Sequence, residues 1–345
     1  MFVVLQTSFL GDMVLTTPLI ERLAQRGAVD VVATPANAPL LANHPAVRRV
    51  IVFDKRGADG GVGGVLRVAR AMRAGEAHAA YLAQGSLRTA ALARLAGIPQ
   101  RVGFATSPGR VLYTSRVPFR RSLHHAQRLW QLASSPLDDA APLLRPSLYP
   151  GADDVAQLDA VMREQGLDRQ SPIVAMAPGS VWATKRWPSF DALAALVGQH
   201  ASFADARVVV LGATSDAPLA AKIGDALREA RLPAPIDATG RLTLLASAAL
   251  IGRARLLVTN DSAPLHLASA MNTPTVAFFG PTVTTFGFGP LSARSALIQH
   301  EQLSCRPCHA HGPQRCPLGH WRCMLELSPE RALDSMQSLL PAQRP

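Results

Sequence analysis

The sequence is poor in aromatic residues, in lysine and in cysteine, and these shortages limit which classes of protein it can encode. Phe, Trp and Tyr make up only 5% of the 345 residues while hydrophobic residues reach 48%, so the core must consist mostly of branched aliphatic side chains. Charged residues amount to 17%, which with this hydrophobic content excludes a mainly disordered chain. The length is about twice that of an ordinary domain and predicts two domains.

Lysine is scarce although the chain is strongly basic. Only Lys55, Lys185 and Lys222 are lysines among 35 basic residues, against 24 acidic ones, so arginine carries the net charge of +11. The planar guanidinium group suits phosphate and carboxylate. The charge therefore favours anionic partners, which include nucleic acid, phospholipid headgroups and sugar phosphates, and does not choose among them.

Several catalytic motifs are missing, and their absence disfavours whole reaction classes. No GxGxxG follows an expected strand, which argues against a nicotinamide-dependent enzyme. Neither GxSxG nor HExxH occurs, so serine-hydrolase and zincin chemistry are not indicated. DxD, the carboxylate pair of metal-dependent nucleotide-sugar transferases, is also missing. Group transfer without a metal remains as the enzymatic interpretation.

No targeting or membrane-spanning segment is indicated. The apolar opening has no basic residue before Arg22, unlike a secretory signal, and we expect the chain to stay in the cytosol. The uncharged stretch 262–293 is long enough to cross a bilayer, but its four prolines and its Gly and Thr residues fit strands, loops and helices better.

Short β-rich runs alternate with helical patterns, which is the signature of βαβ units and a parallel sheet. In the first half we expect strands at 2–6, 29–33, 50–53 and 79–82 and helices at 13–26, 65–73 and 87–96. The pattern lapses between about residues 106 and 154, and a helix at 154–165 follows.

The alternation then resumes through the second half. Strands are expected at 173–177, 207–211, 235–237, 256–259 and 275–279, with helices at 190–200 and 242–253 between them. Two doubly wound α/β domains, joined near residues 150–170, are therefore predicted. Such folds bind ligands at the carboxyl ends of their strands, so we expect a cleft between the two sheets.

Asp12 lies where the first expected strand turns into a helix. Backbone N–H groups at such a turn point toward the expected cleft, which makes Asp12 a candidate catalytic base. The alternative is a helix N-cap, for which Asp is a preferred residue. The two roles conflict in part, because a helix N-terminus lowers the pKa of a carboxylate.

Hydroxyl groups and cations gather in the loop after the strand at 173–177. This loop supplies Ser180, Thr184, Lys185 and Arg186, and it is a candidate phosphate grip although it is no Walker loop. The alternative is an ordinary basic loop with two tryptophans, Trp182 and Trp187, packed beneath it.

A helix begins after the strand at 256–259. Asp261 and Ser262 precede it, and Pro264 occupies an early helical position. The free N–H groups and the dipole of such a helix suit a diphosphate, whereas the alternative makes both residues simple caps. Because Asp261 would repel phosphate, we expect it to face a sugar hydroxyl or its own helix N–H groups.

All four cysteines lie in one segment near the end of the sequence, at Cys305, Cys308, Cys316 and Cys323. In a reducing cytosol a structural zinc site is more natural than two disulfides, with His309, His311 or His320 as substitute ligands. The second half is no CxxC pair, so a packed loop without metal stays open as the alternative. In both cases we expect the cysteines to converge and fasten the loop after the last strand.

Four segments together resemble glycosyltransferase family 9, the ADP-heptose:lipopolysaccharide heptosyltransferases. They are LQTSFLGDMVLTTPLI, PGSVWATKRWPSF, TNDSAPLHLASAMNTPTVAFFGPT and CRPCHAHGPQRCPLGHWRCM, the last looking most like the heptosyltransferase II branch. The resemblance spans most of the chain. It implies an α/β GT-B fold, with an acceptor-binding domain over 1–160 and a nucleotide-sugar-binding domain over 165–345 facing a central cleft.

The resemblance also implies a reaction and roles for single residues. The reaction is an inverting transfer of heptose from ADP-L-glycero-β-D-manno-heptose to an inner-core heptose on lipid A–Kdo. Asp12 matches the family's general base and Lys185 its donor-phosphate lysine. The donor-binding positions are Ser180, Thr184, Lys185, Leu242 beside adenine, Asp261, Ser262 and Ala263. Some members carry hydroxyl residues where this chain has Ala263 and Pro264, so backbone N–H groups must matter more here.

The segment RVGFATSPGRVLYTSRVPFRRSLHHAQR looks like the family's acceptor-side loop. Its arginines suit the anionic Kdo and lipid phosphates and are Arg110, Arg116, Arg120, Arg121 and Arg128. The alternative is a solvated basic face. Membrane binding would be peripheral, at the inner-membrane surface, through Arg-rich loops of the first domain.

The mechanism that follows is a single displacement, in which Asp12 removes the acceptor proton and ADP leaves from the opposite face. Lys185, Thr184 and the helix start at Ser262 stabilise the leaving diphosphate, so no metal cofactor is required. One rival is a GT-B transferase for another nucleotide sugar. The other is a basic nucleic-acid or membrane-surface module with a zinc knuckle, and few basic and aromatic residues surround the cysteines, so we expect no nucleic-acid partner.

Overall fold

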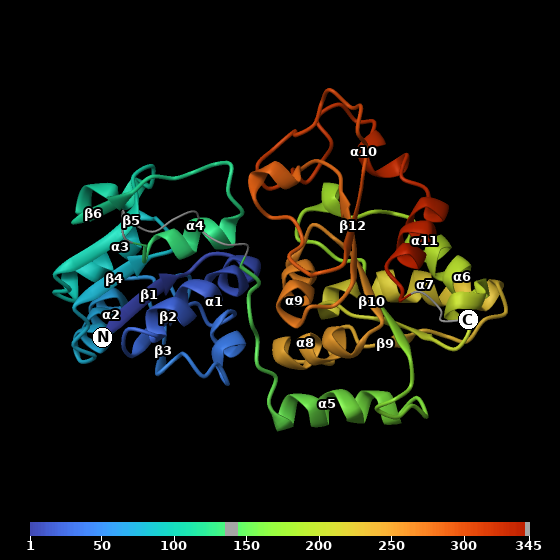
Figure 1. Ribbon diagram of the computed structural model, residues 1–345, viewed down its shortest axis with the longest axis horizontal. Coiled ribbons are helices and arrows are strands. Elements are labelled where there is room, and N and C mark those ends of the chain that lie inside the picture. The colour runs from blue at the N-terminus through green and yellow to red at the C-terminus, as the bar shows by residue number, and fades with distance from the viewer. Residues whose placement is uncertain (135–143, 342–345) are drawn as a thin grey trace. The chain divides into compact units, whose positions relative to one another are not determined.

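The computed structural model describes residues 1–134 and 144–341, and its chain divides into two units, Met1–Tyr149 and Pro150–Pro345 (Figure 1). The sequence places the boundary at 160–165, which is the end of helix α5 (Ala152–Arg163), whereas the two units divide before this helix, between residues 149 and 150. This helix packs on α8 (Leu244–Arg253), and the Thr243 hydroxyl donates a 2.8 Å hydrogen bond to Asp154. Because these contacts lie within the second unit, α5 belongs to it.

The first unit is built on six parallel strands in the order β3-β2-β1-β4-β5-β6. The strands are β1 (Phe2–Gln6), β2 (Val29–Ala33), β3 (Arg49–Val52), β4 (Ala79–Leu82), β5 (Gln100–Phe104) and β6 (Ser115–Val117). The central strands β1, β2 and β4 are buried along their whole length, as expected for continuous apolar runs in a parallel sheet.

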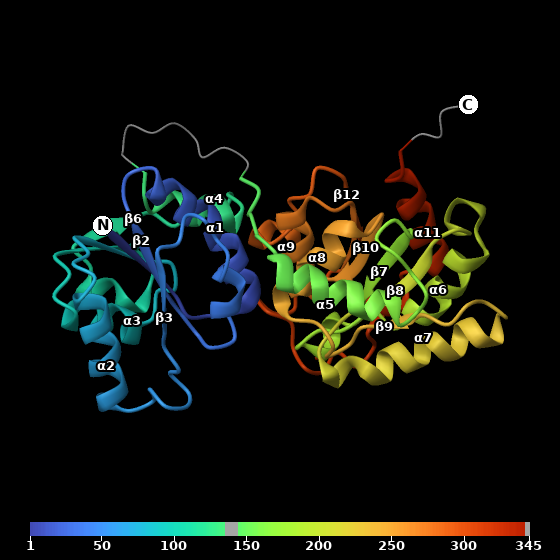
Figure 2. The same cartoon turned by 90° about the horizontal axis from the view of Figure 1, so that it is seen from below.

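Helices cover both faces of this first sheet. They are α1 (Leu10–Ala24), α2 (Val62–Arg73), α3 (Leu87–Leu95) and α4 (His125–Gln131), with short 3₁₀ turns η1 (Ala38–Leu41) and η2 (Pro108–Leu112). Helices α1 and α4 pack together on one face and α2 and α3 on the other (Figure 2). Between the sheet and helices α2 and α3 lies a mostly aliphatic core, as the low aromatic content predicts, with Phe53 and Tyr113 as its aromatic members.

The second unit repeats this plan with strand order β12-β11-β10-β7-β8-β9, all parallel. Its strands are β7 (Ile173–Ala177), β8 (Arg207–Val210), β9 (Ile236–Asp237), β10 (Leu256–Asn260), β11 (Thr275–Phe279) and β12 (Ser295–Gln299). The predicted α/β class with two doubly wound parallel sheets is therefore confirmed.

The helices of the second unit also form two layers. In one layer α6 (Phe190–Gln199) contacts α7 (Ala217–Glu229) and α11 (Pro329–Ser338). In the other layer α8 contacts α5 and α9 (Ala263–Met271). The remaining turns are η3 (Ala183–Lys185), η4 (Ala201–Phe203), η5 (Thr214–Asp216), η6 (Thr284–Phe286) and α10 (Arg322–Leu325).

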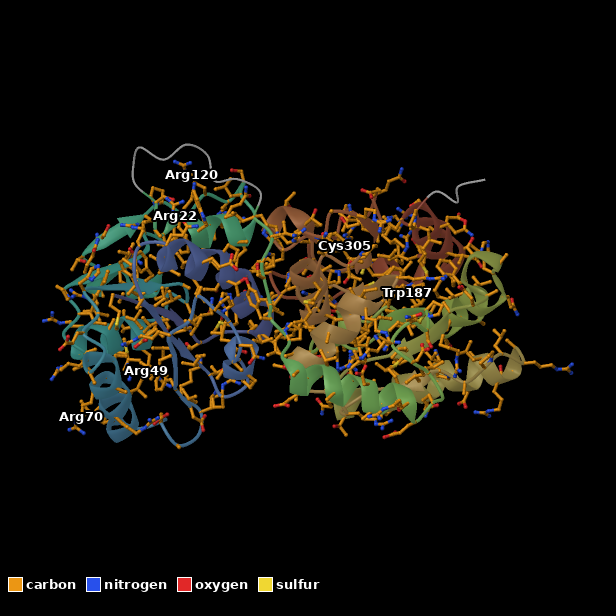
Figure 3. The ribbon with its side chains drawn as sticks, turned by 60° about the horizontal axis from the view of Figure 1, so that its bottom comes forward. Arg22, Arg49, Arg70, Arg120, Trp187 and Cys305 are labelled. Atoms are coloured by element: carbon orange, nitrogen blue, oxygen red, sulfur yellow. The ribbon has the colours of Figure 1, made fainter. Side chains whose placement is uncertain are left out.

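Trp187 anchors the core of this second unit (Figure 3). Its ring stacks on Phe278 with 4.0 Å between centroids, and its indole N–H donates to the Leu327 carbonyl at 3.0 Å. The prediction that Trp187 packs beneath the loop before it is thus confirmed, because the side chain is buried.

No helix among residues 1–134 and 144–341 is both long and apolar enough to cross a bilayer. The uncharged stretch 262–293 instead forms α9, β11 and η6. Pro264 lies at an early position of α9, and the other three prolines lie between or after these elements, where they interrupt no helix.

Candidate functional site

The predicted site residues follow the carboxyl ends of parallel strands within each unit. Asp12 comes after β1, and Asp261 after β10, each beside the start of the next helix. This is the edge at which doubly wound sheets bind their ligands.

Asp12 lies in the first turn of α1 but does not cap it. The N-cap is Phe9, and no side-chain hydrogen bond caps this helix. The carboxylate instead accepts a 2.6 Å hydrogen bond at Oδ2 from the Ser8 hydroxyl. The N-cap alternative is therefore wrong, and the carboxylate is turned toward the loop that precedes the helix.

Buried polar groups hold the backbone around Asp12 in place. The Gln6 amide donates to the Thr16 hydroxyl at 3.1 Å, and this hydroxyl donates to the Asp12 carbonyl at 2.6 Å. Asn37 donates to the Ser8 carbonyl at 2.9 Å. Because Gln6, Thr16 and Asn37 are all buried, these hydrogen bonds fix the direction in which Asp12 leaves the helix.

Two side chains that sequence reasoning did not assign to the site lie beside this turn. His125, at the start of α4, places Nε2 3.8 Å from Asp12 Oδ1. The Lys55 ammonium donates to the Thr7 carbonyl, and burial lowers its pKa, helped by the charges of Arg56 and Arg88. Lysine scarcity was a signal for Lys55, whereas His125 lay in the segment that resembles the acceptor-side loop without being assigned a role.

The five predicted acceptor arginines fall into two groups. Arg110, Arg116, Arg120 and Arg121 are exposed, and Arg120 projects from the edge of the first unit in Figure 3. Arg128 is buried, lies 4.8 Å from the Phe119 ring centroid, and donates to the Arg120 carbonyl at 3.0 Å and to that of Arg121. Arg128 thus supports the segment that carries two of the others, and an acceptor contact for any of the five stays a prediction.

Lys185 and Asp261 form a buried ion pair in the second unit. Lys185 Nζ lies 2.5 Å from Asp261 Oδ2, and the Thr282 hydroxyl donates to the same oxygen at 2.6 Å. Asp261 therefore orients the ammonium group and faces neither its own helix N–H groups nor solvent. This pairing also explains how an aspartate can stand at a candidate phosphate site, since the nearby cation offsets its charge.

The start of α9 lies beside this ion pair. Ser262 is its N-cap and makes no side-chain capping bond, and Pro264 contributes no N–H. Ser262 and Ala263 therefore carry the first amide donors of the helix. Both residues lie in the turn that the sequence analysis predicts to bind a diphosphate.

Residues of the Cys-rich segment, 305–324, hold the loop that carries Ser180 and Thr184 in place. Ala183 N–H donates to Gln314 Oε1 at 3.1 Å, the Gln314 amide donates to the Val181 carbonyl at 3.0 Å, and the Thr184 hydroxyl donates to the Pro313 carbonyl. The Trp182 ring stacks on His311 at 6.2 Å. The Thr184 hydroxyl is thus engaged within the protein.

The other donor-binding candidates have smaller roles in this structure. Ser180 Oγ accepts a hydrogen bond from Trp182 N–H at 3.3 Å, and the Ser180 carbonyl accepts one from Arg186 at 2.8 Å. Leu242 is half-buried in the turn before α8. Trp182, which the ordinary-loop alternative also packs beneath the loop, is only partly buried.

The four cysteines are all free thiols. Burial, and then the neighbouring thiols, raises the pKa of Cys323 to about 11, and burial likewise raises the pKa of Cys308, with contributions from Cys305 and Cys316. Within the described ranges, however, no group of three or more His, Cys, Asp or Glu side chains is arranged to hold a metal ion. The thiols lie in one region without forming a ligand set.

Arg306 fastens the Cys-rich segment to the sheet. Its guanidinium donates to the carbonyls of Phe279 at 2.9 Å and Thr282 at 3.0 Å, and also to those of Gly280 and His300. Arg306, one of the few basic residues beside the cysteines, is thus occupied inside the protein. This weighs against the nucleic-acid-binding alternative.

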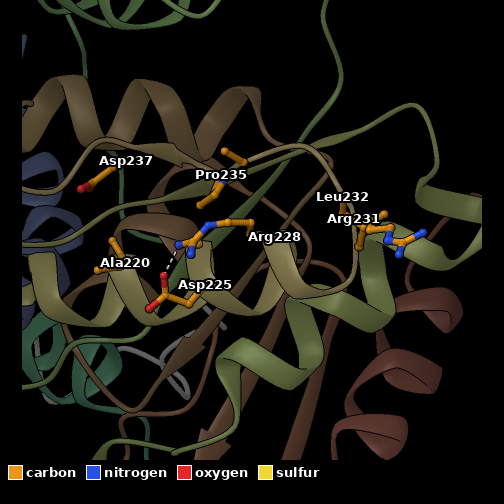
Figure 4. A pocket seen from close by; sticks show the side chains of 10 residues that line it. Ala220, Asp225, Arg228, Arg231, Leu232, Pro235 and Asp237 are labelled. Carbon is orange, nitrogen blue, oxygen red and sulfur yellow. Dashed lines mark hydrogen bonds and ion pairs between the residues drawn. The ribbon is translucent and has the colours of Figure 1, made fainter.

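A hollow of about 620 Å³ lies elsewhere, between α7 and the segment before β9 (Figure 4). Arg228, which is ion-paired with Asp225, and Leu232 contribute to its lining. The described residues that line it include none of the predicted site residues.

Comparison with known proteins agrees with this arrangement. The family model "Glycosyltransferase family 9 (heptosyltransferase)" matches residues 65–319. The chain belongs to this family. It is 26% identical to lipooligosaccharide heptosyltransferase 2 of Haemophilus influenzae, over 96% of this chain and 97% of the relative. It is 25% identical to lipopolysaccharide heptosyltransferase 2 of Escherichia coli, over 98% and 97%.

The family's fold is also the fold of this chain. The solved structure of E. coli ADP-heptose LPS heptosyltransferase II matches with a TM-score of 0.79 and 24% identity, over 98% of each chain. This likeness confirms the predicted GT-B fold, with one Rossmann-like sheet in each unit.

Proposed function

We propose that this member of family 9 is an inverting transferase that moves heptose from ADP-L-glycero-β-D-manno-heptose to the inner core of lipopolysaccharide. Relatives named lipopolysaccharide or lipooligosaccharide heptosyltransferase 2 extend over nearly the whole chain, which supports this substrate class. The observation that carries the proposal is Asp12. Its carboxylate stands at the carboxyl edge of the first sheet, is held by Ser8, and caps no helix.

In the proposed reaction the acceptor oxygen attacks the anomeric carbon of the donor. A new C–O bond forms while the bond from this carbon to the diphosphate breaks, so the anomeric configuration inverts. Asp12 takes the acceptor proton as general base. ADP leaves with the electron pair, and the charge that develops on it needs a preorganised cation or dipole.

The second unit supplies groups suited to that leaving diphosphate. Lys185 Nζ is oriented by Asp261, and the amide donors of Ser262 and Ala263 lie at the start of α9. A bound diphosphate would share the ammonium group with Asp261. In this assignment the second unit binds the nucleotide sugar, with Ser180, Thr184 and Leu242 in its pocket.

The first unit is assigned the acceptor. Exposed Arg110, Arg116, Arg120 and Arg121 suit the carboxylates of Kdo and the phosphates of lipid A. Such an acceptor is anchored in a bilayer, and we infer peripheral binding at the cytoplasmic surface of the inner membrane.

A transfer assay tests the proposed function. Purified protein is incubated with ADP-heptose and a panel of truncated lipopolysaccharide cores, with other nucleotide sugars as competing donors. We expect transfer of heptose to an inner-core acceptor, in the presence of a metal chelator as well as in its absence. Transfer of a different sugar in preference to heptose would favour the rival GT-B activity instead.

The cysteines are proposed as a structural cluster, with zinc as an open alternative. In either case the proposed reaction assigns no step to a metal. Elemental analysis of protein purified without an affinity metal decides between the alternatives. About one zinc per chain supports ligation, and none supports thiols packed as small apolar groups.

Replacing Cys305 and Cys316 together by Ser tests the structural role. We expect a lower melting temperature and a raised KM for the donor with little change in kcat, because residues 311–314 of the same segment fasten the loop at 180–186. Thermal unfolding and steady-state kinetics measure both effects. Unchanged thermal stability with abolished turnover would place the cysteines in the chemistry.

A further inference from the structure

The imidazole of His125 lies against the proposed base within the first unit. Helix α4 packs on α1, and the two side chains are nearly enclosed, with exposed fractions of 14% for His125 and 17% for Asp12. His125 does not cap its own helix, because His124 is the N-cap of α4 and forms a capping box with Gln127. The position of His125 is therefore not explained by helix capping.

The two carboxylate oxygens of Asp12 have different neighbours. Oδ2 accepts the Ser8 hydroxyl at 2.6 Å, while Oδ1 faces His125 Nε2 at 3.8 Å. Ser8 Oγ also lies 2.7 Å from Gln6 Oε1, and its single proton goes preferentially to an ionised carboxylate. Oδ2 is thus occupied, and Oδ1 is the oxygen that can receive a proton from an acceptor hydroxyl.

We propose that His125 relays the proton that Asp12 removes from the acceptor. Asp12 Oδ1 first binds the acceptor proton; this O–H bond then breaks as an N–H bond forms on His125 Nε2, and Asp12 returns to its carboxylate. The imidazolium afterwards releases the proton to water. The inference rests on the proposed transferase function, and His125, which acts through Asp12, is a positioning residue.

The geometry requires only a small approach of the two side chains. Nε2 and Oδ1 must move from 3.8 Å to hydrogen-bond distance, a change of about 1 Å. Catalytic hydrogen bonds are commonly long without substrate and shorten when it binds.

The protonation states at rest also suit a relay. Burial lowers the pKa of His125, Asp12 on α1 opposes this effect, and Arg128 on α4 adds to it. Arg121 in turn faces Arg128. Because the pKa of His125 lies below its usual value, the imidazole is neutral near pH 7 and able to accept a proton. Below that pKa it becomes imidazolium, and the relay is blocked.

The chain offers a matched control in His44. Its Nε2 lies 3.8 Å from Glu21 Oε1, its side chain is buried, and burial lowers its pKa to about 4. Glu21 is nine residues beyond Asp12 on the same helix, about 13 Å along its axis. His44→Gln thus removes a similar buried His–carboxylate pair away from the proposed base.

The experiment compares wild type, His125→Gln, His125→Asn and His44→Gln across pH 5–9 with saturating ADP-heptose and acceptor. For both His125 variants we expect kcat to fall at least about tenfold with both KM values within about twofold. The fall in kcat toward acid pH that His125 causes in wild type should vanish in them. His44→Gln should be less stable to heat but keep the wild-type kcat and pH profile.

Three results would overturn the relay alone, given normal heptose transfer by the wild type. These are unchanged kcat in the His125 variants, an equal loss in His44→Gln, or a change confined to KM. Should neither His125 variant fold, a wild-type kcat that does not fall at any acid pH at which the protein stays folded overturns the relay by itself. Absence of heptose transfer in the wild type instead overturns the proposed function, and the relay with it.

Discussion

Asp12→Asn is expected to lower kcat by about a hundredfold or more, while the fold and the affinity for ADP stay unchanged. The amide keeps the size of the carboxylate and can still accept the Ser8 hydrogen bond at its oxygen, so the 2.6 Å contact survives. What is lost is the carboxylate oxygen that accepts the proton of the attacking hydroxyl. Because Asp12 caps no helix, the substitution removes no capping interaction from α1.

Turnover at saturating substrates, ADP binding by calorimetry and thermal unfolding measure these three properties. Asp154→Asn is a suitable control, since this aspartate also lies in the first turn of a helix, α5, and accepts hydrogen bonds there. We expect the control to lose some stability and to keep its kcat. A near-native kcat for Asp12→Asn would remove this residue from the chemistry.

Lys185→Ala is expected to weaken transition-state binding by about 2 to 4 kcal/mol, as when one electrostatic stabiliser of a developing anion is removed. The structure adds a second effect. Asp261 would be left without its 2.5 Å cationic partner in a site where both side chains are about nine-tenths buried. Removing one partner of a buried ion pair lowers the free energy of unfolding by about 3 kcal/mol or more. The single variant should therefore also melt at a lower temperature.

The double variant Lys185→Ala/Asp261→Asn separates the two effects. Neutralising the orphaned carboxylate should restore much of the thermal stability, whereas kcat/KM for the donor should remain low. Lys222→Ala is the matched control, because its ion pair with Asp191 at 2.9 Å is largely exposed and worth at most about 1 kcal/mol. Native ADP affinity and turnover in Lys185→Ala would contradict the assignment.

The fold followed from the sequence wherever a strand is buried on both faces. β1, β2, β4, β7 and β11 have the bounds that their apolar runs predict, since a central parallel strand must be apolar throughout. Some partly buried elements were not predicted, although the partly exposed strand β3 was. Edge strands β6 and β12 expose much of their length and α4 is short, so none of them has a strong apolar pattern.

The candidate site was predictable to the level of single loops. Strand-to-helix turns are local features, and Asp12, Lys185 and Asp261 stand in such turns or loops by virtue of the strands before them. Their residue types, a carboxylate at a first turn and cations in a loop, indicate chemistry before any contact is known. Lys185 stood out because lysine is scarce and because it shares a loop with Thr184 and Arg186, whereas scarcity by itself could equally have singled out Lys55.

Only the tertiary structure decided which side chains meet. Lys185 reaches Asp261 across 76 positions because β7 and β10 are neighbours in the sheet, and His125 reaches Asp12 because α4 packs on α1. It also separated exposed arginines from Arg128 and Arg306, which hold backbone carbonyls inside the protein. Composition fixes the number of charges, but whether a charge faces a ligand or supports the chain depends on strand order and helix packing, which bring distant residues together.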